Sequence, residues 1–168
     1  MTLHRNALTG TIPSDIAALT SLEKIFLQGN RLNGTIPSSF DDLTELKSLR
    51  LDGNYLTGTI PTELGVLTEL TELWLHDNSH TGSIPTELAG LTKLRDLSLG
   101  NNRLTGTIPT ELGALTALTA LWLYDNDHTG AIPTELARLT ALNVLSLSTS
   151  QRFLFIEIAY SSLVTLRR

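Results

Sequence analysis

The sequence predicts an α/β-type solenoid, in which about six 24-residue coils stack to form a parallel β-sheet. Two sets of residues recur at this period. The prolines of the chain all fall at one spacing, 24 positions apart, at Pro13, Pro37, Pro61, Pro85, Pro109 and Pro133. Asparagines recur in a second register, at Asn6, Asn30, Asn54, Asn78, Asn102 and Asn126. An internal period of this length is typical of solenoids, in which each coil packs only on its neighbours.

Each repeat opens with a leucine pattern that predicts a short strand. Leu46, Leu49 and Leu51 illustrate the pattern L-x-x-L-x-L. Because side chains alternate between the two faces of a strand, the last two leucines point inward and the residue between them points outward. Stacking of the coils then aligns these strands in a parallel sheet.

The segments after the strand predict two turns. The recurring asparagine has both donor and acceptor groups, so it can satisfy backbone groups that a turning strand leaves unpaired, and stacked coils are expected to form an internal asparagine ladder. A Gly-x-Ile-Pro block follows, in which glycine permits unusual backbone angles and proline ends the strand. The segment Thr-Glu-Leu-x-x-Leu after the proline is too short for a full helix and predicts one 3₁₀ or α turn.

The repeated phrase L-T-G-x-I-P, as in residues 56–61, makes a family resemblance specific. The chain resembles the plant-type leucine-rich repeat of receptor-like kinase ectodomains and polygalacturonase-inhibiting proteins, over residues 2–149. The resemblance implies a right-handed superhelix, with the parallel sheet on its concave side and the short turns on its convex side. It also implies a non-catalytic module that binds a protein, peptide or glycan on that sheet. Such modules belong to receptor-like signalling proteins or secreted defence-type proteins, so an extracellular or cell-surface location is expected.

The chain departs from this class at both ends. Members normally carry paired cysteines in both capping regions, whereas this chain has none. We therefore expect residues 1–149, with an incomplete first repeat, to be a fragment whose uncapped ends favour end-to-end self-association. Residues 150–168 abandon the repeat. They are either a C-terminal cap, sealed by Phe153 and Phe155, or a mis-predicted segment.

Composition excludes several classes of function. The formal net charge of −5 argues against binding that relies on neutralising nucleic-acid phosphates. The absence of cysteine excludes disulfides, thiolate metal sites and a cysteine nucleophile. No apolar run approaches the length of roughly 18 residues that a membrane-spanning helix needs. No cofactor is expected.

The outward positions of the predicted sheet carry the candidate binding residues. These are Phe26, Arg50, Asp52, Trp74, His76, Trp122 and Tyr124. Exposed Trp, Tyr and Arg are the residue types that dominate binding hot spots. Neighbouring strands lie about 4.8 Å apart, so Trp74 and Trp122 should stand about 10 Å apart with the small Ser98 between them. Asp77 and Asp125 are expected to extend the carboxylate rim begun by Asp52. The alternative is that the rings only cover the sheet and support their cross-strand neighbours.

The sequence indicates neither an enzyme nor a metal site. His80 and His128 stand where other repeats have leucine, about 10 Å apart on alternate coils, which is too far to share a metal ion. We expect them to be hydrogen-bonded histidines that fill leucine positions. No Ser–His–Asp arrangement recurs, and His76 and Asp77 are expected to leave opposite faces of the sheet. An acidic residue follows five of the six Ile-Pro-x blocks, at Asp15, Glu63, Glu87, Glu111 and Glu135. A calcium ladder is the weaker interpretation, and a favourable contact with the positive end of each turn is the stronger.

Two further expectations concern the segment around the Gly-x-Ile-Pro blocks. Asn33-Gly34-Thr35 is the only triplet of the chain that fits the acceptor pattern for N-glycosylation. Thr-Gly-Thr recurs at residues 9–11, 57–59 and 105–107, and columns of such threonines are similar to the faces of ice-binding solenoids. Ice binding is therefore the alternative function, although threonine is also a common strand former.

Overall fold

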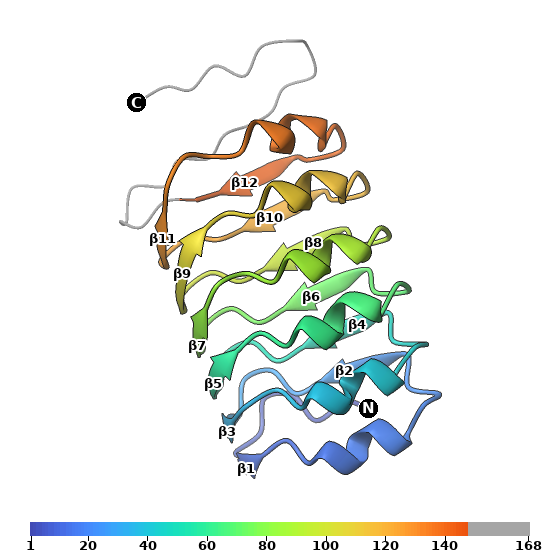
Figure 1. Ribbon diagram of the computed structural model, residues 1–168. Coiled ribbons are helices and arrows are strands. Elements are labelled where there is room, and N and C mark those ends of the chain that lie inside the picture. Colours follow the sequence, from blue (N-terminus) through green and yellow to red (C-terminus); the bar gives the residue numbers. More distant parts are fainter. Residues whose placement is uncertain (148–168) are drawn as a thin grey trace.

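The computed structural model describes residues 1–147, which form a stack of similar coils around one apolar interior (Figure 1). One strand from each coil builds a parallel sheet that we call the concave sheet. Its strands, in spatial order, are β12 (Val144–Ser146), β10 (Ala120–Trp122), β8 (Asp96–Ser98), β6 (Glu72–Trp74), β4 (Ser48–Arg50) and β2 (Lys24–Phe26). The predicted solenoid with a parallel sheet is confirmed.

A second parallel sheet follows the asparagine turn of each coil. Its strands, in order, are β1 (Thr9–Thr11), β3 (Arg31–Gly34), β5 (Tyr55–Thr59), β7 (Ser79–Gly82), β9 (Arg103–Thr107) and β11 (Asp127–Thr129). Each coil then makes a five-residue 3₁₀ helix. These are η1 (Ser14–Ala18), η2 (Ser38–Asp42), η3 (Thr62–Val66), η4 (Thr86–Gly90), η5 (Thr110–Ala114) and η6 (Thr134–Arg138).

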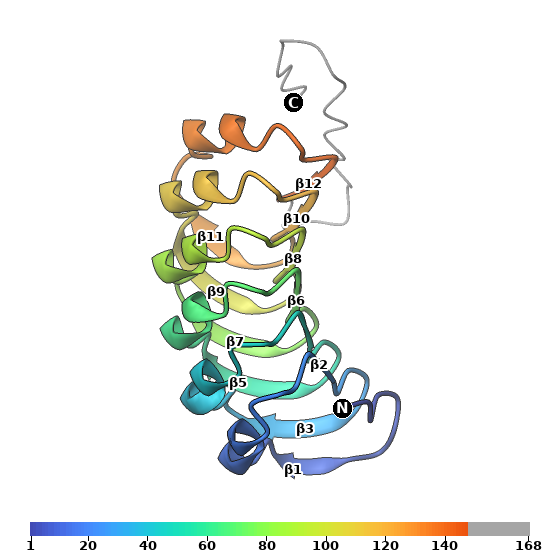
Figure 2. The ribbon, with the colours of Figure 1, turned by 90° about the vertical axis from the view of Figure 1, so that its right-hand side faces the viewer.

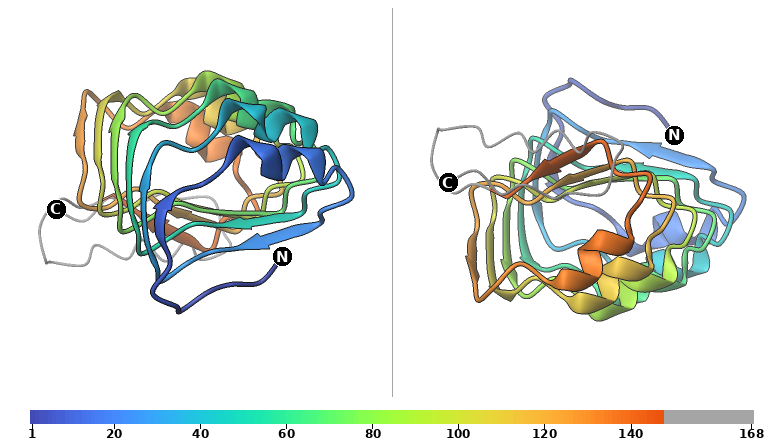
Figure 3. Two further views of the ribbon diagram at one scale, coloured as in Figure 1. Left: turned by 90° about the horizontal axis from the view of Figure 1, so that it is seen from below. Right: turned by 90° about the horizontal axis from the view of Figure 1, so that it is seen from above.

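The three rows of elements form the sides of a flattened coil when the stack is viewed end-on (Figure 3). The row of 3₁₀ helices lies on the outer curve of the stack, and the concave sheet lies on the inner curve (Figure 2). The predicted position of the short turns on the convex side is therefore confirmed.

The two sheets differ in register. In the concave sheet Leu49 pairs with Leu73, 24 positions further on, so equivalent residues of successive coils lie directly opposite one another. In the second sheet Thr57 pairs with Ser79, which is 22 positions further on. Equivalent side chains are therefore aligned across the concave sheet but staggered by two residues at each step across the second sheet.

The interior is filled by the periodic leucines and isoleucines. Leu49, Leu51 and Leu73 are fully buried, and so is Phe40, which takes the place of the 3₁₀ leucine in η2. Because each residue contacts its own coil and the adjacent ones, apolar burial stabilises the stack coil by coil.

The predicted asparagine ladder is present. Asn54 is buried, and its Oδ1 accepts a hydrogen bond of 3.0 Å from the backbone N–H of Leu32 in the preceding coil. Its Nδ2 donates to the carbonyl oxygens of Leu27, at 3.1 Å, and Leu51, at 3.0 Å. One side chain thus joins two coils and satisfies backbone groups at the point where both chains turn.

Proline and glycine set the remaining turns. Pro61 has an extended backbone (φ −63°, ψ 134°) immediately before η3, and its carbonyl oxygen accepts the hydrogen bond that opens the 3₁₀ turn from Leu64. Gly58 has a φ of +74°, and the methyl carbon of Thr35 lies 2.8 Å from where a β-carbon would stand. That position therefore requires glycine both for its backbone angle and for the close approach of the neighbouring coil.

The first coil is less covered than the second. Leu3 is 44% exposed and Leu8 is 37% exposed, whereas their equivalents Leu27 and Leu32 are 4% and 6% exposed. The expected cap or mis-predicted segment at 150–168 lies outside the described residues. Across residues 1–147, none of the helices has the length and apolar character that a bilayer crossing demands.

Candidate functional site

The seven predicted binding residues all lie on the inner face of the stack. Phe26, Arg50, Trp74 and Trp122 occupy one row across the concave sheet, because each is the last residue of its strand. Asp52, His76 and Tyr124 follow two residues later and form a second row. Ser98 is paired with Trp74 on one side and with Trp122 on the other, as the sequence predicts. Ser98 is only 5% exposed, so its small side chain is nearly covered.

Arg50 is held between two aromatic rings and a carboxylate. Its guanidinium carbon lies 4.0 Å from the centroid of the Trp74 ring and 5.2 Å from that of Phe26. Its Nε and Nη2 donate hydrogen bonds of 3.2 and 3.0 Å to Oε2 of Glu72. The hydroxyl of Ser48 donates to the same oxygen at 2.6 Å.

Glu72 and Ser48 were not among the predicted site residues. They are the first residues of β6 and β4, so they point to the same face as Trp74 and Arg50. Burial raises the pKa of Glu72, but the hydrogen bonds from Ser48 and Arg50 outweigh that effect and hold the pKa below its ordinary value. The carboxylate is therefore ionised at neutral pH and anchors Arg50 over Trp74.

His76 links three coils. Its Nδ1 lies 3.0 Å from the hydroxyl oxygen of Ser98, and its Nε2 lies 3.7 Å from a carboxylate oxygen of Asp52 and 3.7 Å from one of Asp77. The expectation that His76 and Asp77 leave opposite faces is therefore wrong. Asp77 has a φ of 55°, so the strand alternation has already ended there and its side chain turns back towards the imidazole.

The structure also brings Ser98, His76 and Asp52 together, which sequence reasoning missed. The signal was present in the 24-residue register. Trp74 pairs with Arg50 and with Ser98, and Asp52 and His76 stand two residues after Arg50 and Trp74. Ser98 is nearly covered, so its hydroxyl contacts His76 and is not available to an incoming substrate. Burial raises the pKa of Asp52 above its ordinary value, and its Oδ1 has no hydrogen-bond partner among residues 1–147.

Tyr124 closes the site at the C-terminal side. Its ring lies over Gly100, where a β-carbon would come within 2.5 Å of the ring. Burial, followed by the charges of Asp77 and Asp125, raises the pKa of Tyr124 above its ordinary value. Asp77 and Asp125 are exposed at the rim, and Nδ2 of Asn101 donates to Asp77 at 2.6 Å. With Asp52 they form the expected carboxylate rim.

His80 and His128 lie away from this surface. His80 is fully buried, and burial lowers its pKa. The backbone of Gly58 and Thr57 lies against the ring and partly offsets this effect, although neither ring nitrogen makes a well-formed hydrogen bond within 1–147. His128 is half-buried, and its Nδ1 lies 3.4 Å from the carbonyl oxygen of Gly106. No group of three His, Cys, Asp or Glu side chains within 1–147 is placed to hold a metal ion.

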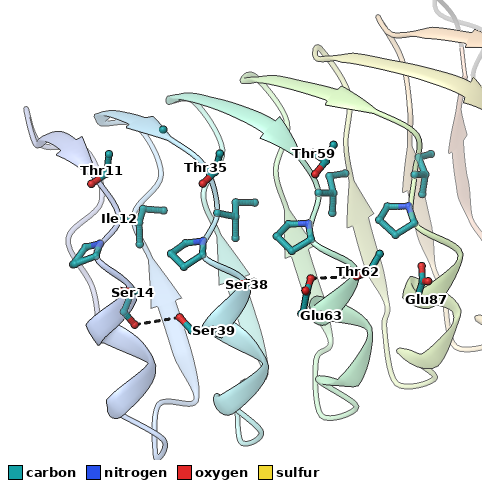
Figure 4. A pocket seen from close by; sticks show the side chains of 18 of the residues that line it. Thr11, Ile12, Ser14, Thr35, Ser38, Ser39, Thr59, Thr62, Glu63 and Glu87 are labelled. Carbon is teal, nitrogen blue, oxygen red and sulfur yellow. Dashed lines mark hydrogen bonds between the residues drawn. The ribbon is translucent and has the colours of Figure 1, made fainter.

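A shallow groove of about 1270 Å³ runs across four coils between the second sheet and the 3₁₀ helices (Figure 4). Thr11, Thr35 and Thr59 lie along one side of it, and Glu63 and Glu87 lie along the other (Figure 4). The groove is formed by the repeat itself, since each coil contributes the same positions. It is separate from the concave sheet.

Comparison with known proteins agrees with this architecture. The family model of the leucine-rich repeat region matches residues 3–107. No curated protein matches the chain.

Solved structures of plant proteins are similar over most of the chain. The ectodomain of the membrane receptor kinase GASSHO1/SCHENGEN3 from Arabidopsis thaliana, in complex with CASPARIAN STRIP INTEGRITY FACTOR 2, is 36% identical over 87% of this chain and 18% of that one (TM-score 0.86). The Arabidopsis receptor kinase HAESA, in complex with the peptide hormone IDA and the co-receptor SERK1, is 39% identical over 88% of this chain and 24% of that one (TM-score 0.85).

A plant ice-binding protein is also similar, with 36% identity over 82% of this chain and 45% of that one (TM-score 0.78). This chain thus spans less than half of the length of each of these three structures. The stacked coils, the asparagine ladder and the family match agree, and the chain belongs to the leucine-rich repeat proteins.

Proposed function

We propose that the chain is a non-catalytic binding module that holds a peptide or protein partner on the concave sheet, between β2 and β10. The observation that carries the proposal is the row Phe26–Arg50–Trp74–Ser98–Trp122, in which aromatic rings stand on either side of a buried serine. Large aromatic and Arg side chains that are already held in place lose little entropy when a partner binds, which favours affinity.

The chemistry of the surface favours a peptide that carries a basic residue beside an apolar one. Trp74 and Trp122, which pair with Ser98 from its two sides, offer ring surface to an apolar or flat group. Asp52, Asp77 and Asp125 lie beside this row and offer carboxylates to a cation. Arg50 is already paired with Glu72, so the opposite charge at the N-terminal side is largely neutralised. A hydroxyl-rich glycan stacked on the indoles is the competing ligand class.

The similar structures support a peptide over a glycan. The receptor kinases among them were solved in complex with CASPARIAN STRIP INTEGRITY FACTOR 2 and with the peptide hormone IDA. By the same comparison, we place the module outside the cell, in a receptor-like or secreted defence-type protein. The fragment hypothesis fits the short span that the chain covers of those structures.

The experiment is a selection of peptides from a random-sequence display library against the immobilised 168-residue chain. Enriched peptides are resynthesised, and their affinities are measured for the unmodified chain and for Trp122→Ser, since serine occupies the equivalent positions 98 and 146. We expect at least about a tenfold loss, as is typical of a binding hot spot. Tyr55→Thr, an exposed aromatic on the second sheet, is the matched control and should bind normally.

Two results would count against the proposal. One is that peptides bind Trp122→Ser and the unmodified chain equally. The other is that oligosaccharide probes, but no peptides, bind in a manner that depends on Trp74 and Trp122, which would assign the surface to glycans.

Ice binding is a second candidate function, favoured by the similarity to a plant ice-binding protein. Thr59 pairs with Thr81, and all three residues of the strand Thr9–Thr11 are exposed. The stagger of the second sheet works against an extended threonine lattice, because Thr81 in turn pairs with Arg103. Thermal hysteresis measured on the purified chain tests this candidate. Activity that Thr59→Tyr abolishes and Trp122→Ser leaves intact would support it.

We also propose that the isolated chain self-associates through its first coil. Leu3 and Leu8 are exposed there, whereas the next coil covers its own equivalents. Sedimentation velocity over a range of concentrations should show a dimer that Leu3→Glu weakens. A concentration-independent monomer would exclude it.

A further inference from the structure

Asn33 differs in burial and bonding from the asparagines of the ladder. Asn30, three residues earlier, is 7% exposed and its Oδ1 and Nδ2 are engaged with the backbone. Asn33 lies in β3, is exposed, and its side chain makes no hydrogen bond to any residue of 1–147. Its amide nitrogen is therefore free for chemistry at the surface.

The coil does not require asparagine at this position. The equivalent residues of the other coils are all threonine: Thr9, Thr57, Thr81, Thr105 and Thr129. Threonine is also the better strand former, so neither packing nor strand propensity accounts for Asn33. Asparagine in place of the usual threonine creates Asn33-Gly34-Thr35, the one N-x-Thr/Ser triplet of the chain, and Thr35 is exposed.

We propose that Asn33 is an N-glycosylation site and that its glycan covers the N-terminal part of the second sheet while leaving the concave sheet open. The inference rests on the extracellular location given under the proposed function. The carboxamide nitrogen of Asn33 loses a proton and forms an N-glycosidic bond to the anomeric carbon of an oligosaccharide, while the bond from that carbon to the donor's oxygen breaks and lipid pyrophosphate leaves. The hydroxyl of Thr35 is required for recognition by the transferase.

The position of Asn33 decides what the glycan would cover. Asn33 pairs with Thr11 on one side and with Tyr55 on the other. Thr11, Gly34 and Thr35 also line the groove beside the second sheet, at the end where the stack begins (Figure 4). A bulky, hydrated glycan here excludes flat contact with an ice surface on this side. It would lie away from the concave sheet, which forms another side of the coil (Figure 3).

The test is secretion of the chain, behind a signal peptide, from a yeast or insect cell. We expect an electrophoretic shift that peptide-N-glycosidase removes, and conversion of Asn33 to Asp in the mass spectrum of the treated protein. Thr35→Ala should lose the shift and Thr35→Ser should keep it. Both residues occur at the equivalent position of other coils, as Ala131 and Ser83, so neither change should impair folding. Thr59→Ala is the matched control in the next coil and should keep the shift.

Secreted chain without a glycan on Asn33 would overturn the inference. Failure of the glycosylation inference is distinguishable from failure of the proposed function, because binding of the library-selected peptides is measured separately, on secreted protein with and without peptide-N-glycosidase treatment. Peptide binding that is unchanged by removal of the glycan supports the placement described above. Peptide binding that increases on removal would contradict it, since the glycan would then obstruct the concave sheet.

Discussion

The guanidinium carbon of Arg50 lies 4.0 Å from the centroid of the Trp74 ring, while Nε and Nη2 of the same guanidinium donate to one oxygen of Glu72. The planar group is thus fixed by its edge and by its face at once. Trp74 in turn has one side covered by a cation that is held in place. The Trp74 ring is therefore held in place before any ligand arrives, which reduces the cost of binding.

Arg50→Lys is expected to loosen Trp74 although the charge is kept. A lysine ammonium cannot donate two hydrogen bonds to Glu72 and lie flat on the indole at the same time. We expect a loss of about 1 kcal/mol in the free energy of unfolding and greater quenching of Trp74 fluorescence by acrylamide. The measurement uses a Trp122→Phe background so that one indole reports. Arg31→Lys, an exposed residue on β3, is the control. Unchanged quenching would show that the stack does not restrain the ring.

Asn54→Ala should destabilise the chain strongly. The change removes an acceptor for the N–H of Leu32 and donors to the carbonyl oxygens of Leu27 and Leu51, all at a buried site. Because each buried group left without a partner costs about 1–3 kcal/mol, a loss of about 3 kcal/mol or more is expected. Urea unfolding measures it. Asn6→Ala is the matched control: Asn6 is exposed and, within 1–147, its side chain donates only to the carbonyl oxygens of Leu3 and His4, so water can replace it. Equal losses for the two variants would refute the argument.

The periodic positions were predictable because each has one physical role in every coil. The equivalents of Leu49 and Asn54 recur with the period of the repeat, and the spacing alone placed one in the interior and the other at the turn. The outward direction of Trp74 and Trp122 followed from strand alternation. The stagger of the second sheet was not predictable, since a repeat tells which residues are equivalent and not which of them pair.

The contacts within the site were harder to predict. The alternation of side chains between the two faces of the strand does not continue as far as Asp77. The positive φ of Asp77 returns its side chain towards His76. The pairing of Glu72 with Arg50 could have been inferred from two adjacent strands of known register. The covering of Gly100 by Tyr124 depends on a side-chain rotamer, which no sequence pattern specifies.

His80→Leu should stabilise the chain and flatten its dependence on acid pH. Leucine occupies this position in other coils, for instance Leu56 and Leu104, and the change removes buried ring nitrogens that make no well-formed hydrogen bond within 1–147. A gain of about 1–3 kcal/mol at neutral pH is expected. Burial lowers the pKa of folded His80, so the unfolded chain takes up a proton that the folded chain resists. The contribution of neutral His80 to the free energy of unfolding of the unmodified chain is therefore fully present above the unfolded pKa of about 6.5. It is lost as the pH falls through the lower folded pKa.

Urea unfolding of the two chains across this pH range measures the effect. His128→Leu is the comparison, because His128 fills the same position but is half-buried and lies 3.4 Å from the carbonyl oxygen of Gly106. We expect a smaller gain there. If His80→Leu were destabilising, the imidazole would have to make a favourable contact in the interior.

Gly100→Ala is expected to turn Tyr124 towards solvent without unfolding the coil. Gly100 does not have a positive φ, so alanine fits the backbone, but its β-carbon would lie 2.5–2.7 Å from three ring atoms of Tyr124. Because burial is the main cause of the raised pKa of Tyr124, exposure of the ring should bring the pKa back towards its ordinary value of about 10. Spectrophotometric titration in a Tyr55→Phe, Tyr160→Phe background isolates this phenol. Asp125→Asn should lower the pKa less, since that charge contributes less than burial. A pKa that Gly100→Ala leaves raised would mean that the carboxylates, and not the cover over Gly100, control the phenol.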